Sequence, residues 1–433
     1  MAKEAGGCRV KLEKVPLKYP GLKPWQIWIS ESQERMTLAV PKKKWQQLLS
    51  LLRRRGVEAS VIGEFTDSGK CTVLYKSNKV MDLDMQFLHD GLPKRHLKSS
   101  LYVRKYSEPK LPPATDLTSV LLKMLSRLNI ASFEFISIQY DHEVQGNSVL
   151  KPLQGRGRIN SDTTVIRPIL SSQKGIILSQ ALYPTYSDID TYAMAAASID
   201  NAVRNVVAAG GNPEKIALLD NFCWCSSTDP KRLYQLKRAV RACFDHATYY
   251  QTPFISGKDS MFNDFKGYNS KGDQVNISIP PTLLISAISV VDDVTSTVSL
   301  DAKFPGDLVY ILGETKAELG GSEYFNLLSN DDLQNIGNTV PEVDTVKNKK
   351  VYLAFHKAVR QSLIVSAQSI GRGGLGVALV KTALGGRWGV KVNLKQVSKK
   401  VLRDDFVLFS ESQGRILVTV APQNKQKFEK LFP

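Results

Sequence analysis

Apolar residues along the chain follow both helical and strand-like spacings. Four of them fall at the i, i+3, i+4, i+7 spacing that gives a helix one buried face: Trp45, Leu48, Leu49 and Leu52. A second helix is expected over residues 117–128, LTSVLLKMLSRL, with Asp116 as its N-cap. The run VEASVIGEFTDSGKCTVLY indicates two strands joined by a turn at residues 67–69, and IALLDNFCW (216–224) is typical of a buried strand. The chain is therefore predicted to mix helices with strands.

One pattern of apolar and polar positions occurs twice. Residues 27–40 read IWISESQERMTLAV, and residues 407–420 read VLFSESQGRILVTV. In each stretch an apolar, strand-like run precedes Ser-Glu-Ser-Gln, and an arginine and a second apolar run follow it. The glutamates of the two motifs are Glu31 and Glu411, so the two copies lie near opposite ends of the chain.

The likeness continues outward from both motifs. Upstream, residues 2–15 parallel residues 381–397 with a short gap. Downstream, residues 41–52 and 422–432 each begin with a proline and continue as a basic amphipathic helix. Chance can supply one four-letter match but hardly three in the same order, so the sequence predicts an internal repeat.

The two copies begin and end at different points of the repeat. The first opens at Ala2, inside the helix that the second copy has at 371–386. The second stops at Pro433, inside a helix after which the first copy continues into two strands. We therefore expect a window cut from a longer two-copy protein. A domain without its closing strands is expected to expose an unpaired sheet edge and apolar surface.

Composition also divides the chain into regions. Proline, lysine and serine concentrate in residues 91–114, as in linkers between domains. A compact region runs from residue 115 to residue 305, where FPGDLVYILGE starts another strand-led region. The predicted structured regions are 1–90, 115–305 and 306–433.

Bulk composition is that of a globular protein. Of the 433 residues, 42% are hydrophobic and 23% are charged, and a chain of this length is expected to hold roughly two to four domains. No stretch approaches the roughly 20 apolar residues that span a bilayer, and the N-terminus lacks the apolar core of a secretory signal. A cytoplasmic location is therefore expected.

The net charge of +17 raises the question of a nucleic-acid partner. The basic residues are spread over several segments, and no recognised nucleic-acid module or base-stacking strand motif is evident. We expect a basic surface that meets phosphorylated metabolites or an acidic partner subunit, with no nucleic-acid and no membrane partner. The irregularly spaced cysteines fit buried or half-buried thiols better than disulfides or a zinc site: Cys8, Cys71, Cys223, Cys225 and Cys243.

Glycine, lysine and serine lie close together in ISGKDSMFND (255–264), as in loops that bind phosphate. The segment is not a P-loop, because G-x-x-x-x-G-K-[ST] is absent. Gly257 allows close backbone approach, Lys258 can neutralise a phosphate, and Ser260 can donate a hydroxyl hydrogen bond. A strand-ending turn with solvated polar residues explains the same spacing equally well.

Several carboxylates are further candidates. Asp220 follows an apolar run, where a carboxylate can hold a ligand hydroxyl or a metal, or cap the next turn. Asp162 lies in NSDTTVIRP, and the pair Asp188 and Asp190 is more typical of a solvated turn than of a metal site. His142 has no second histidine at a metal-binding spacing, so a structural role is expected.

Together these motifs resemble a known family. The run LEKVPLKYPGLKPWQIWISESQERM is similar to the signature of the larger subunit of the phosphoribosylformylglycinamidine synthases, in the aminoimidazole ribonucleotide synthetase superfamily. YDHEVQG, SDTTVIRP, IDNAVRN, LLDNFCW and SGKDSM follow in family order. The resemblance implies an α+β fold with PurM-like (aminoimidazole ribonucleotide synthetase-like) domains in a tandem pseudo-repeat. Residues 1–90 and the truncated 306–433 resemble C-terminal-type domains of the first and second units, and 115–305 the N-terminal-type domain of the second.

The resemblance also implies a reaction. It is the ATP-dependent amidation of formylglycinamide ribonucleotide to formylglycinamidine ribonucleotide in de novo purine biosynthesis, by a carbon–nitrogen ligase with glutamine as amido-nitrogen donor. ATP and Mg²⁺ are the implied cofactors. A separate glutaminase subunit or domain is expected to supply ammonia. In the family the first N-terminal domain carries the catalytic histidine, so we expect a partner that carries this domain and assign no catalytic residue here.

Site roles are implied only where motifs match. The implied substrate contacts are Glu31, Ser32, Gln33 and Ser260; the implied ATP contacts are Asp220, Gly257 and Lys258; the implied metal ligands are Asp162 and Asn205. Some family members have a magnesium-ligating asparagine in place of Lys258, whose ammonium fits a phosphate instead.

The second unit departs from the family pattern in two places. Asn201 stands where a metal carboxylate is usual, and Gln368-Ser369-Ile370-Gly371-Arg372-Gly373-Gly374-Leu375 lacks two acidic positions. These losses imply that the second nucleotide site is structural. A non-catalytic nucleotide-binding or scaffolding subunit of the same complex is the alternative function. A selenophosphate synthetase-like enzyme is disfavoured, because no catalytic cysteine motif lies near the N-terminus.

Overall fold

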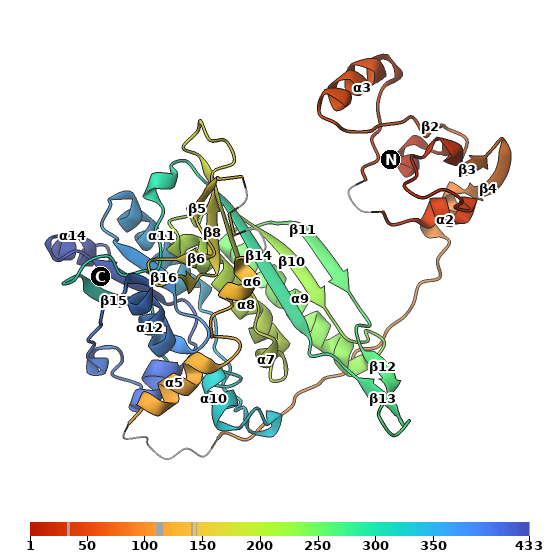
Figure 1. Cartoon of the computed structure of the whole chain (residues 1–433). Coiled ribbons are helices and arrows are strands. Elements are labelled where there is room, and N and C mark those ends of the chain that lie inside the picture. Colours follow the sequence, from red (N-terminus) through yellow and green to blue (C-terminus); the bar gives the residue numbers. More distant parts are fainter. Residues whose placement is uncertain (33–34, 110–115, 140–141, 144, 433) are drawn as a thin grey trace. The chain divides into compact units, whose positions relative to one another are not determined.

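The computed structural model describes residues 1–32, 35–109, 116–139, 142–143 and 145–432 (Figure 1). They form two compact units, Met1–His96 and Leu97–Pro433. Each unit has its own buried core. The predicted boundary at residues 305 and 306 lies inside the second unit, and this division stays a prediction.

The first unit is built on a sheet with the strand order β2-β1-β3-β4. The expected turn before Lys70 is present, and Gly69 adopts a φ of +69° there. The strands on either side of this turn do not pair with each other, because β1 lies between them, antiparallel to β2 and parallel to β3. The elements of this unit are α1 Ala2–Ala5, β1 Cys8–Lys11, α2 Pro24–Ile29, α3 Trp45–Arg54, β2 Gly63–Phe65, β3 Lys70–Tyr75, β4 Asn78–Asp84 and α4 Met85–Asp90.

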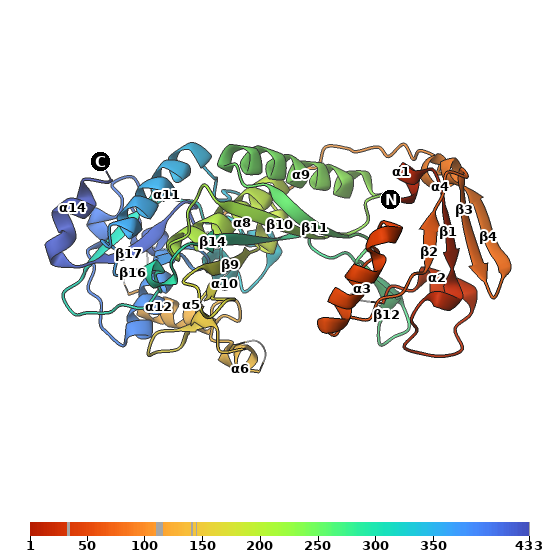
Figure 2. The same cartoon turned by 90° about the horizontal axis from the view of Figure 1, so that it is seen from above.

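The second unit contains a six-stranded sheet in the order β11-β10-β14-β9-β8-β5. Alternate residues of β9 and β14 are buried, and the buried members face α8. Because α8 carries alanines on the side that meets the sheet, it can approach closely, and α9 runs alongside it (Figure 2). These elements are β5 Ser148–Leu150, β8 Thr163–Ile166, β9 Gly175–Ala181, α8 Thr191–Ala208, β10 Ile216–Cys223, α9 Pro230–Tyr250, β11 Phe254–Ser260 and β14 Thr282–Val291.

A second sheet of this unit has the order β15-β17-β16. One hydrophobic core joins it to the larger sheet, since residues of β9, α8, α11 and β17 belong to the same buried cluster. The elements are β15 Leu308–Leu312, α10 Glu323–Leu328, α11 Thr345–Arg360, β16 Ser366–Ser369, α12 Gly374–Gly386, α13 Asp404–Phe409, β17 Ile416–Val420 and α14 Lys425–Glu429. The remaining elements are α5 Thr118–Ser126, α6 Glu134–Ser137, β6 Leu153–Gln154, β7 Ile159–Asn160, α7 Pro184–Ser187, β12 Phe265–Tyr268 and β13 Gln274–Ile277.

The internal repeat is reproduced in three dimensions. Helices α2 and α13 are separated along the chain by the same offset as Glu31 and Glu411, and so are the first residues of α3 and α14. Within the motif, Nη2 of Arg35 donates to the Ser30 carbonyl at 2.6 Å, and Nη2 of Arg415 donates to the Ser410 carbonyl at 2.6 Å. The prediction of a strand before each motif is wrong, because both runs are helical. Helix α2 starts at a proline, where the missing N–H costs nothing.

The run after each motif has a different structure in the two copies. In the second copy Ile416–Val420 forms β17, which pairs with β15 on one side and β16 on the other. In the first copy residues 36–40 form no strand, and Met36 and Leu38 are 90% and 57% exposed. A strand needs hydrogen-bonding neighbours, and none pairs with residues 36–40 in the part of the chain that the structure describes. The exposure of apolar surface was expected of the second copy, which stops before its closing strands, so the exposed run of the first unit leaves that expectation a prediction.

The predicted helix over 117–128 is observed as the slightly shorter α5. The predicted N-cap is one residue off, because Leu117 occupies that position; Asp116 Oδ1, one residue upstream, accepts a hydrogen bond from the Thr118 backbone N–H at 2.9 Å. The segment before it, within the predicted linker, runs along the second unit rather than away from it. There Tyr106 is buried and its hydroxyl donates to the Asp188 carbonyl at 3.1 Å.

A buried ion pair joins α8 to the rest of the second unit. Arg204 and Asp200 are fully buried and form a salt bridge one helical turn apart. Asp200 also accepts hydrogen bonds from the Tyr250 and Tyr352 hydroxyls, at 2.6 and 2.7 Å. The Gly414 backbone N–H donates to Asp200 at 3.1 Å. One carboxylate thus connects three helices with the loop of the second Ser-Glu-Ser-Gln motif.

Replacing Arg204 with glutamine is expected to destabilise the second unit by about 3–5 kcal/mol, because a buried carboxylate loses its counter-charge. The matched control is Arg241→Gln, which removes an arginine at the same i, i+4 spacing from an aspartate on an exposed helix face. Its expected cost is below about 1 kcal/mol. Denaturant unfolding measures both free energies, and equal losses would contradict the importance of the buried pair.

Candidate functional site

The glycine–lysine–serine segment is an edge strand. Residues 254–260 form β11, which pairs in parallel with β10, so they are a strand and not a loop or a turn, and phosphate binding by them stays a prediction. In this register Asp220 lies beside Gly257. A Cβ at position 257 would lie 2.4 Å from Asp220 Oδ1, so glycine is what allows the carboxylate to lie against the neighbouring backbone.

Strand alternation separates the four candidate residues of this site into two pairs. Asp220 and Gly257 lie on the side of the sheet that α8 and α9 cover. Lys258 and Ser260 point to the opposite, open face, and Lys258 Nζ lies 2.7 Å from Ser260 Oγ. Lys258 and Ser260 therefore lie on the same face of the sheet, and Asp220 lies on the opposite face.

Asp220 is a carboxylate with a perturbed acidity. Partial burial and the nearby Asp259 carboxylate raise the pKa of Asp220, while the Lys258 backbone N–H opposes the rise. A carboxyl group with a raised pKa, near a ligand, can accept hydrogen bonds or hold a cation that restores its charge.

The open face of the six-stranded sheet is apolar. Its outward residues on β9, β10 and β14 include Leu178, Leu219 and Val290, which are between 37% and 55% exposed. An antiparallel sheet with one solvated face usually carries polar residues there. An apolar open face that also carries Lys258 and Ser260 is typical of a surface that another protein surface covers.

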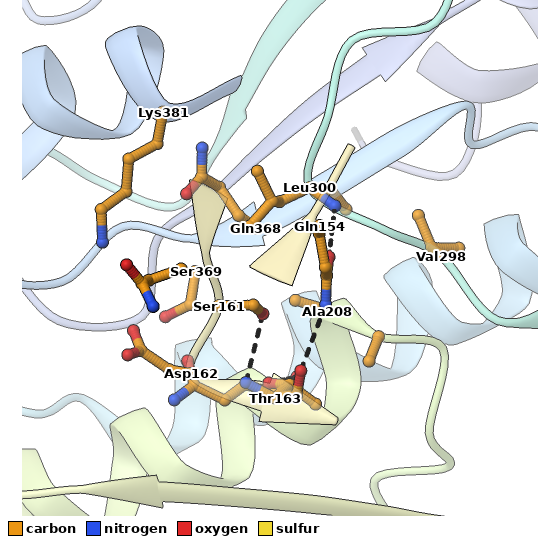
Figure 3. Close-up of a pocket in the computed structure, with 14 residues that line it drawn as sticks. Gln154, Ser161, Asp162, Thr163, Ala208, Val298, Leu300, Gln368, Ser369 and Lys381 are labelled. Atoms are coloured by element: carbon orange, nitrogen blue, oxygen red, sulfur yellow. Dashed lines mark hydrogen bonds between the residues drawn. The ribbon is translucent and has the colours of Figure 1, made fainter. Parts of the chain in front are cut away.

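Asp162 lines a polar pocket (Figure 3). Asn205 is another of its lining residues. The volume of this cavity is about 30 Å³, enough for about two water molecules. The pocket is lined by Gln154, Asn160, Ser161, Asp162, Thr163, Asn205, Ala208, Ala209, Val298, Leu300, Ala367, Gln368, Ser369 and Lys381.

The donor set of this pocket fits a cation only in part. Asn205 Nδ2 donates to the Gln180 carbonyl at 3.3 Å, which leaves the amide oxygen of Asn205 as a ligand. The Asp162 carboxylate is exposed. Among the described residues no three histidine, cysteine, aspartate or glutamate side chains form a metal-binding group. One carboxylate and one amide oxygen fit Mg²⁺ where phosphate and water oxygens complete its shell, and Lys381 in the same pocket fits a phosphate.

The described residues of the first Ser-Glu-Ser-Gln motif present polar groups to solvent. Glu31 and Ser32 are exposed, and Gln33 lies outside the described residues. Arg35 holds the loop through the Ser30 and Ser32 carbonyls, and the hydroxyls of the two serines lie 3.0 Å apart. Arg35 thus holds the described part of the motif, whose Glu31 and Ser32 side chains are exposed.

The second motif is buried, and other parts of the chain occupy its polar groups. Glu411 accepts hydrogen bonds from the Tyr186 hydroxyl at 2.6 Å and from the Gly373 and Glu323 backbone N–H groups at 2.8 and 3.0 Å. Burial and the neighbouring Glu323 carboxylate raise the pKa of Glu411 from its ordinary value near 4.5 to about 7. This copy is therefore a structural element.

Arg204 completes the buried motif, although no sequence motif singled it out. Its Nη2 donates to Gln413 Oε1 at 3.0 Å and to Asn201 Oδ1 at 2.7 Å. The departure at Asn201 was the available signal, because an amide there can accept from a guanidinium. Ser369 belongs to the same network, since its hydroxyl accepts from Arg204 Nε at 2.8 Å.

The acidic pair at 188 and 190 has structural roles. Asp190 caps α8 by accepting from the Tyr192 backbone N–H at 2.8 Å, and it pairs with Arg238 at 2.6 Å. Asp188 accepts the Tyr106 hydroxyl through its backbone carbonyl. The five cysteines are free thiols, all of them buried or half-buried, as expected.

Comparison with known proteins identifies the family. The sequence model described as AIR synthase related protein, C-terminal domain, matches residues 1–76 and 305–433. The one described as AIR synthase related protein, N-terminal domain, matches residues 160–279. The chain belongs to the AIR synthase related family. The two C-terminal-domain matches also coincide with the two copies of the internal repeat.

Similar proteins carry the name expected from the motifs. The chain is 36% identical over 97% of its length to the phosphoribosylformylglycinamidine synthase subunit PurL of Methanocaldococcus jannaschii, of which it covers 55%. It is 32% identical over its whole length to the PurL subunit of Caldanaerobacter subterraneus subsp. tengcongensis, of which it covers 56%. The predicted resemblance is confirmed, and the chain spans about half the length of these relatives.

Solved structures confirm the fold class. The structure of Thermotoga maritima PurL complexed with ATP matches 96% of this chain with a TM-score of 0.58 and 19% identity, over 56% of its own length. The predicted tandem aminoimidazole ribonucleotide synthetase-like fold is therefore correct. Among the described residues, no helix combines the length and the apolar character needed to cross a bilayer.

Replacing Glu411 with glutamine is expected to change the pH dependence of stability. A carboxyl group whose folded-state pKa is raised stabilises the fold most below its unfolded pKa. This contribution is lost as the pH rises from about 4.5 to about 7, by about 3 kcal/mol in total. The free energy of unfolding of Glu411→Gln relative to the parent chain should therefore increase across this interval and stay constant above it.

Denaturant titrations between pH 4 and pH 8 measure this difference. Glu31→Gln is the matched control, because Glu31 occupies the same motif position in the other unit and is exposed. Its effect on unfolding of the second unit should be absent at every pH. A constant difference for Glu411→Gln over the whole interval would contradict the raised pKa.

Proposed function

We propose that this chain takes part in the ATP-dependent amidation of formylglycinamide ribonucleotide to formylglycinamidine ribonucleotide. The observation that carries the proposal is the similarity over nearly the whole chain to PurL subunits, together with the exposed first motif. The Thermotoga maritima protein of the same fold has structures in complex with ATP and with FGAR. The ligase activity, its glutamine-derived nitrogen and its place in purine biosynthesis are parts of this proposal.

The buried motif supports a role for the exposed one in substrate binding. In the second copy Glu411 receives two N–H groups and one hydroxyl, all from the protein. Glu31 has the same motif position and faces solvent. A ribonucleotide offers hydroxyls and an amide N–H, which are the same kinds of donor. We therefore assign Glu31, Ser32 and Gln33 to the substrate. Ser260 is assigned to the substrate separately, on its own motif in the second unit.

The open sheet face supports a role in nucleotide binding. Lys258 and Ser260 lie together on it, and an ammonium beside a hydroxyl suits a phosphate group. Asp220 and Gly257 lie on the other side of the same two strands, so in this proposal they hold the backbone that presents Lys258. Phosphoryl transfer from ATP to the amide oxygen creates the leaving group that ammonia displaces.

The pocket around Asp162 and Asn205 supports a metal–phosphate site of the second unit. The two side chains supply oxygen ligands for Mg²⁺, and Lys381 supplies a positive charge for a phosphate. This site is assigned a structural role, because Asn201 and Ser369, at the positions that depart from the family pattern, are engaged with Arg204.

The proposal includes two protein partners. One is a glutaminase subunit or domain that supplies ammonia, and the other carries the N-terminal domain that the family resemblance implies. The structure of PurLQS from Thermotoga maritima is an assembly that contains a PurL chain of similar fold. The apolar open face of the larger sheet supports the need for a protein partner.

Synthase activity with ammonium chloride as nitrogen source is expected only when the chain is mixed with a protein that carries this domain. In the active mixture Glu31→Gln should lower kcat/KM by about 10- to 100-fold, the effect of losing a charge-assisted hydrogen bond. Glu58→Gln, at another exposed glutamate of the first unit, is the control and should leave the rate unchanged.

Activity of the chain alone would contradict the need for a partner. An absence of activity in both samples, with folded protein, would favour the alternative of a non-catalytic nucleotide-binding or scaffolding subunit.

Lys258→Ala is expected to weaken ATP binding about 5- to 10-fold, because a phosphate loses one charged contact. Lys266→Ala is the matched control, since Lys266 is an exposed lysine on the neighbouring β12. Calorimetric titration of the partner-bound chain with ATP measures both dissociation constants. Equal dissociation constants for the two variants would remove Lys258 from the ATP site.

A further inference from the structure

Two buried thiols face each other within the sheet of the first unit. Cys8 lies in β1 and Cys71 in β3, and the two residues are direct neighbours in the parallel register of these strands. Their sulfur atoms lie 3.4 Å apart, and the two residues are 8% and 5% exposed. Both are free thiols in this structure. Neither thiol has a role in the proposed amidation.

The backbone geometry of this pair fits a disulfide. Neighbouring strands of a sheet lie about 4.8 Å apart, and the Cα atoms of disulfide-bonded cysteines are usually about 4.4–6.8 Å apart. The two side chains point to the same face of the sheet, because their sulfur atoms are in contact. Bond formation needs the sulfur atoms to approach from 3.4 Å to about 2.0 Å, through rotation of the side chains and a small shift of one strand.

The pair belongs to the core on which the helix before the first motif packs. One buried cluster contains both cysteines together with Leu12, which follows β1, and Ile27 of α2. Helix α2 leads directly into Ser30 and Glu31 of the first Ser-Glu-Ser-Gln motif. A covalent bond between β1 and β3 would therefore hold the strands that support α2.

The ends of the strands give small reactants access to the pair. Cys8 is the first residue of β1 and Cys71 the second residue of β3, so both lie at the same end of their strands. Opening of strand ends requires less free energy than unfolding of a whole unit. Burial and the neighbouring Cys8 thiol raise the pKa of Cys71 to about 12, which makes this thiol slow to react while the sheet is closed. Oxidation is therefore expected to follow local opening.

We propose that Cys8 and Cys71 form a reversible disulfide that stabilises the first unit under oxidising conditions. The oxidant is a low-molecular-weight disulfide. The thiolate of one cysteine attacks a sulfur of this disulfide, which forms a mixed disulfide and releases one small thiolate. The thiolate of the other cysteine then attacks the protein sulfur of the mixed disulfide, which forms the protein disulfide and releases the second small thiolate. Two protein thiols thus lose two electrons and two protons, and the oxidant is reduced to two thiols.

The bond closes a loop that contains the first motif and helix α3. A cross-link stabilises a fold mainly by restricting the unfolded chain, and the effect grows with the length of the closed loop. Cys8 and Cys71 are 63 positions apart, so the unfolding equilibrium constant of this unit is expected to fall about 100- to 1000-fold on oxidation. The inference rests on this thiol pair and on no part of the proposed amidation.

Incubation of the full chain with oxidised glutathione under native conditions tests the proposal. The expected product has lost two hydrogen atoms, retains three of its five free thiols and yields a cross-linked peptide pair that joins Cys8 to Cys71. Intact mass and peptide mapping measure these changes. Hydrogen exchange of β1 and β3 in increasing denaturant measures the unfolding equilibrium constant of the first unit. Dithiothreitol should reverse the stabilisation.

Matched variants locate the effect. Cys71→Ala should abolish both the cross-link and the stabilisation by oxidised glutathione. Cys243→Ala removes a buried thiol of the second unit and should preserve both. Cys8→Ala provides a second test, because it removes the other sulfur while Cys71 stays in place, and circular dichroism checks that each variant is folded.

Three results would overturn the proposal. One is five free thiols in the folded chain after prolonged treatment with oxidised glutathione. The second is a stable glutathione adduct on Cys8 or Cys71 without the cross-link, because the two thiols would then react independently. The third is a cross-link between these two cysteines that leaves the unfolding equilibrium constant of the first unit unchanged.

Discussion

The buried Asp200–Arg204 pair is the constraint around which the second unit is arranged. A charged pair in a protein interior is tolerated only when hydrogen bonds satisfy its remaining donors and acceptors. Burial lowers the pKa of Arg204, but the Asp200 carboxylate and neighbouring tyrosines outweigh it, and the guanidinium stays charged. Its partners come from α8, from the end of β16 and from the second motif. The pair therefore fixes the larger sheet, the smaller sheet and the motif loop relative to one another.

The two motif copies show that local sequence determines the loop and that its surroundings determine its role. The arginine of each copy holds the same carbonyls, so the backbone turn belongs to the motif itself. The two copies differ in the groups that donate hydrogen bonds to the motif glutamate. Tyr186 and two backbone N–H groups reach Glu411, whereas Glu31 faces solvent. Hydrogen bonds within the protein satisfy the buried Glu411 carboxylate, so it cannot also bind a ligand. The exposed Glu31 carboxylate, in the loop of the first motif, can bind one.

The sequence predicted the features that depend on local pattern and on the repeat. The constant offset between the two copies, the helix that begins near Asp116, the free thiols and the tandem fold are all observed. The helical form of the runs before the motifs was missed, because a short apolar run fits either a helix or a strand until its packing is known. The strand at 254–260 was missed for the same reason. The role of Arg204 depends on Ser369 and Gln413, which are so distant along the chain that no local pattern reveals them.

The irregular conformation of residues 36–40 shows how strand formation depends on neighbouring strands. An apolar run can bury its side chains in several ways, but its backbone groups need strands at a fixed distance on both sides. In the second copy those strands are β15 and β16, which lie far upstream of β17 in the sequence, with helices α10 and α11 between them. The strand character of β17 is therefore a property of the assembled sheet. Among the described residues no strand pairs with residues 36–40, and the backbone there is irregular although its apolar pattern is the same.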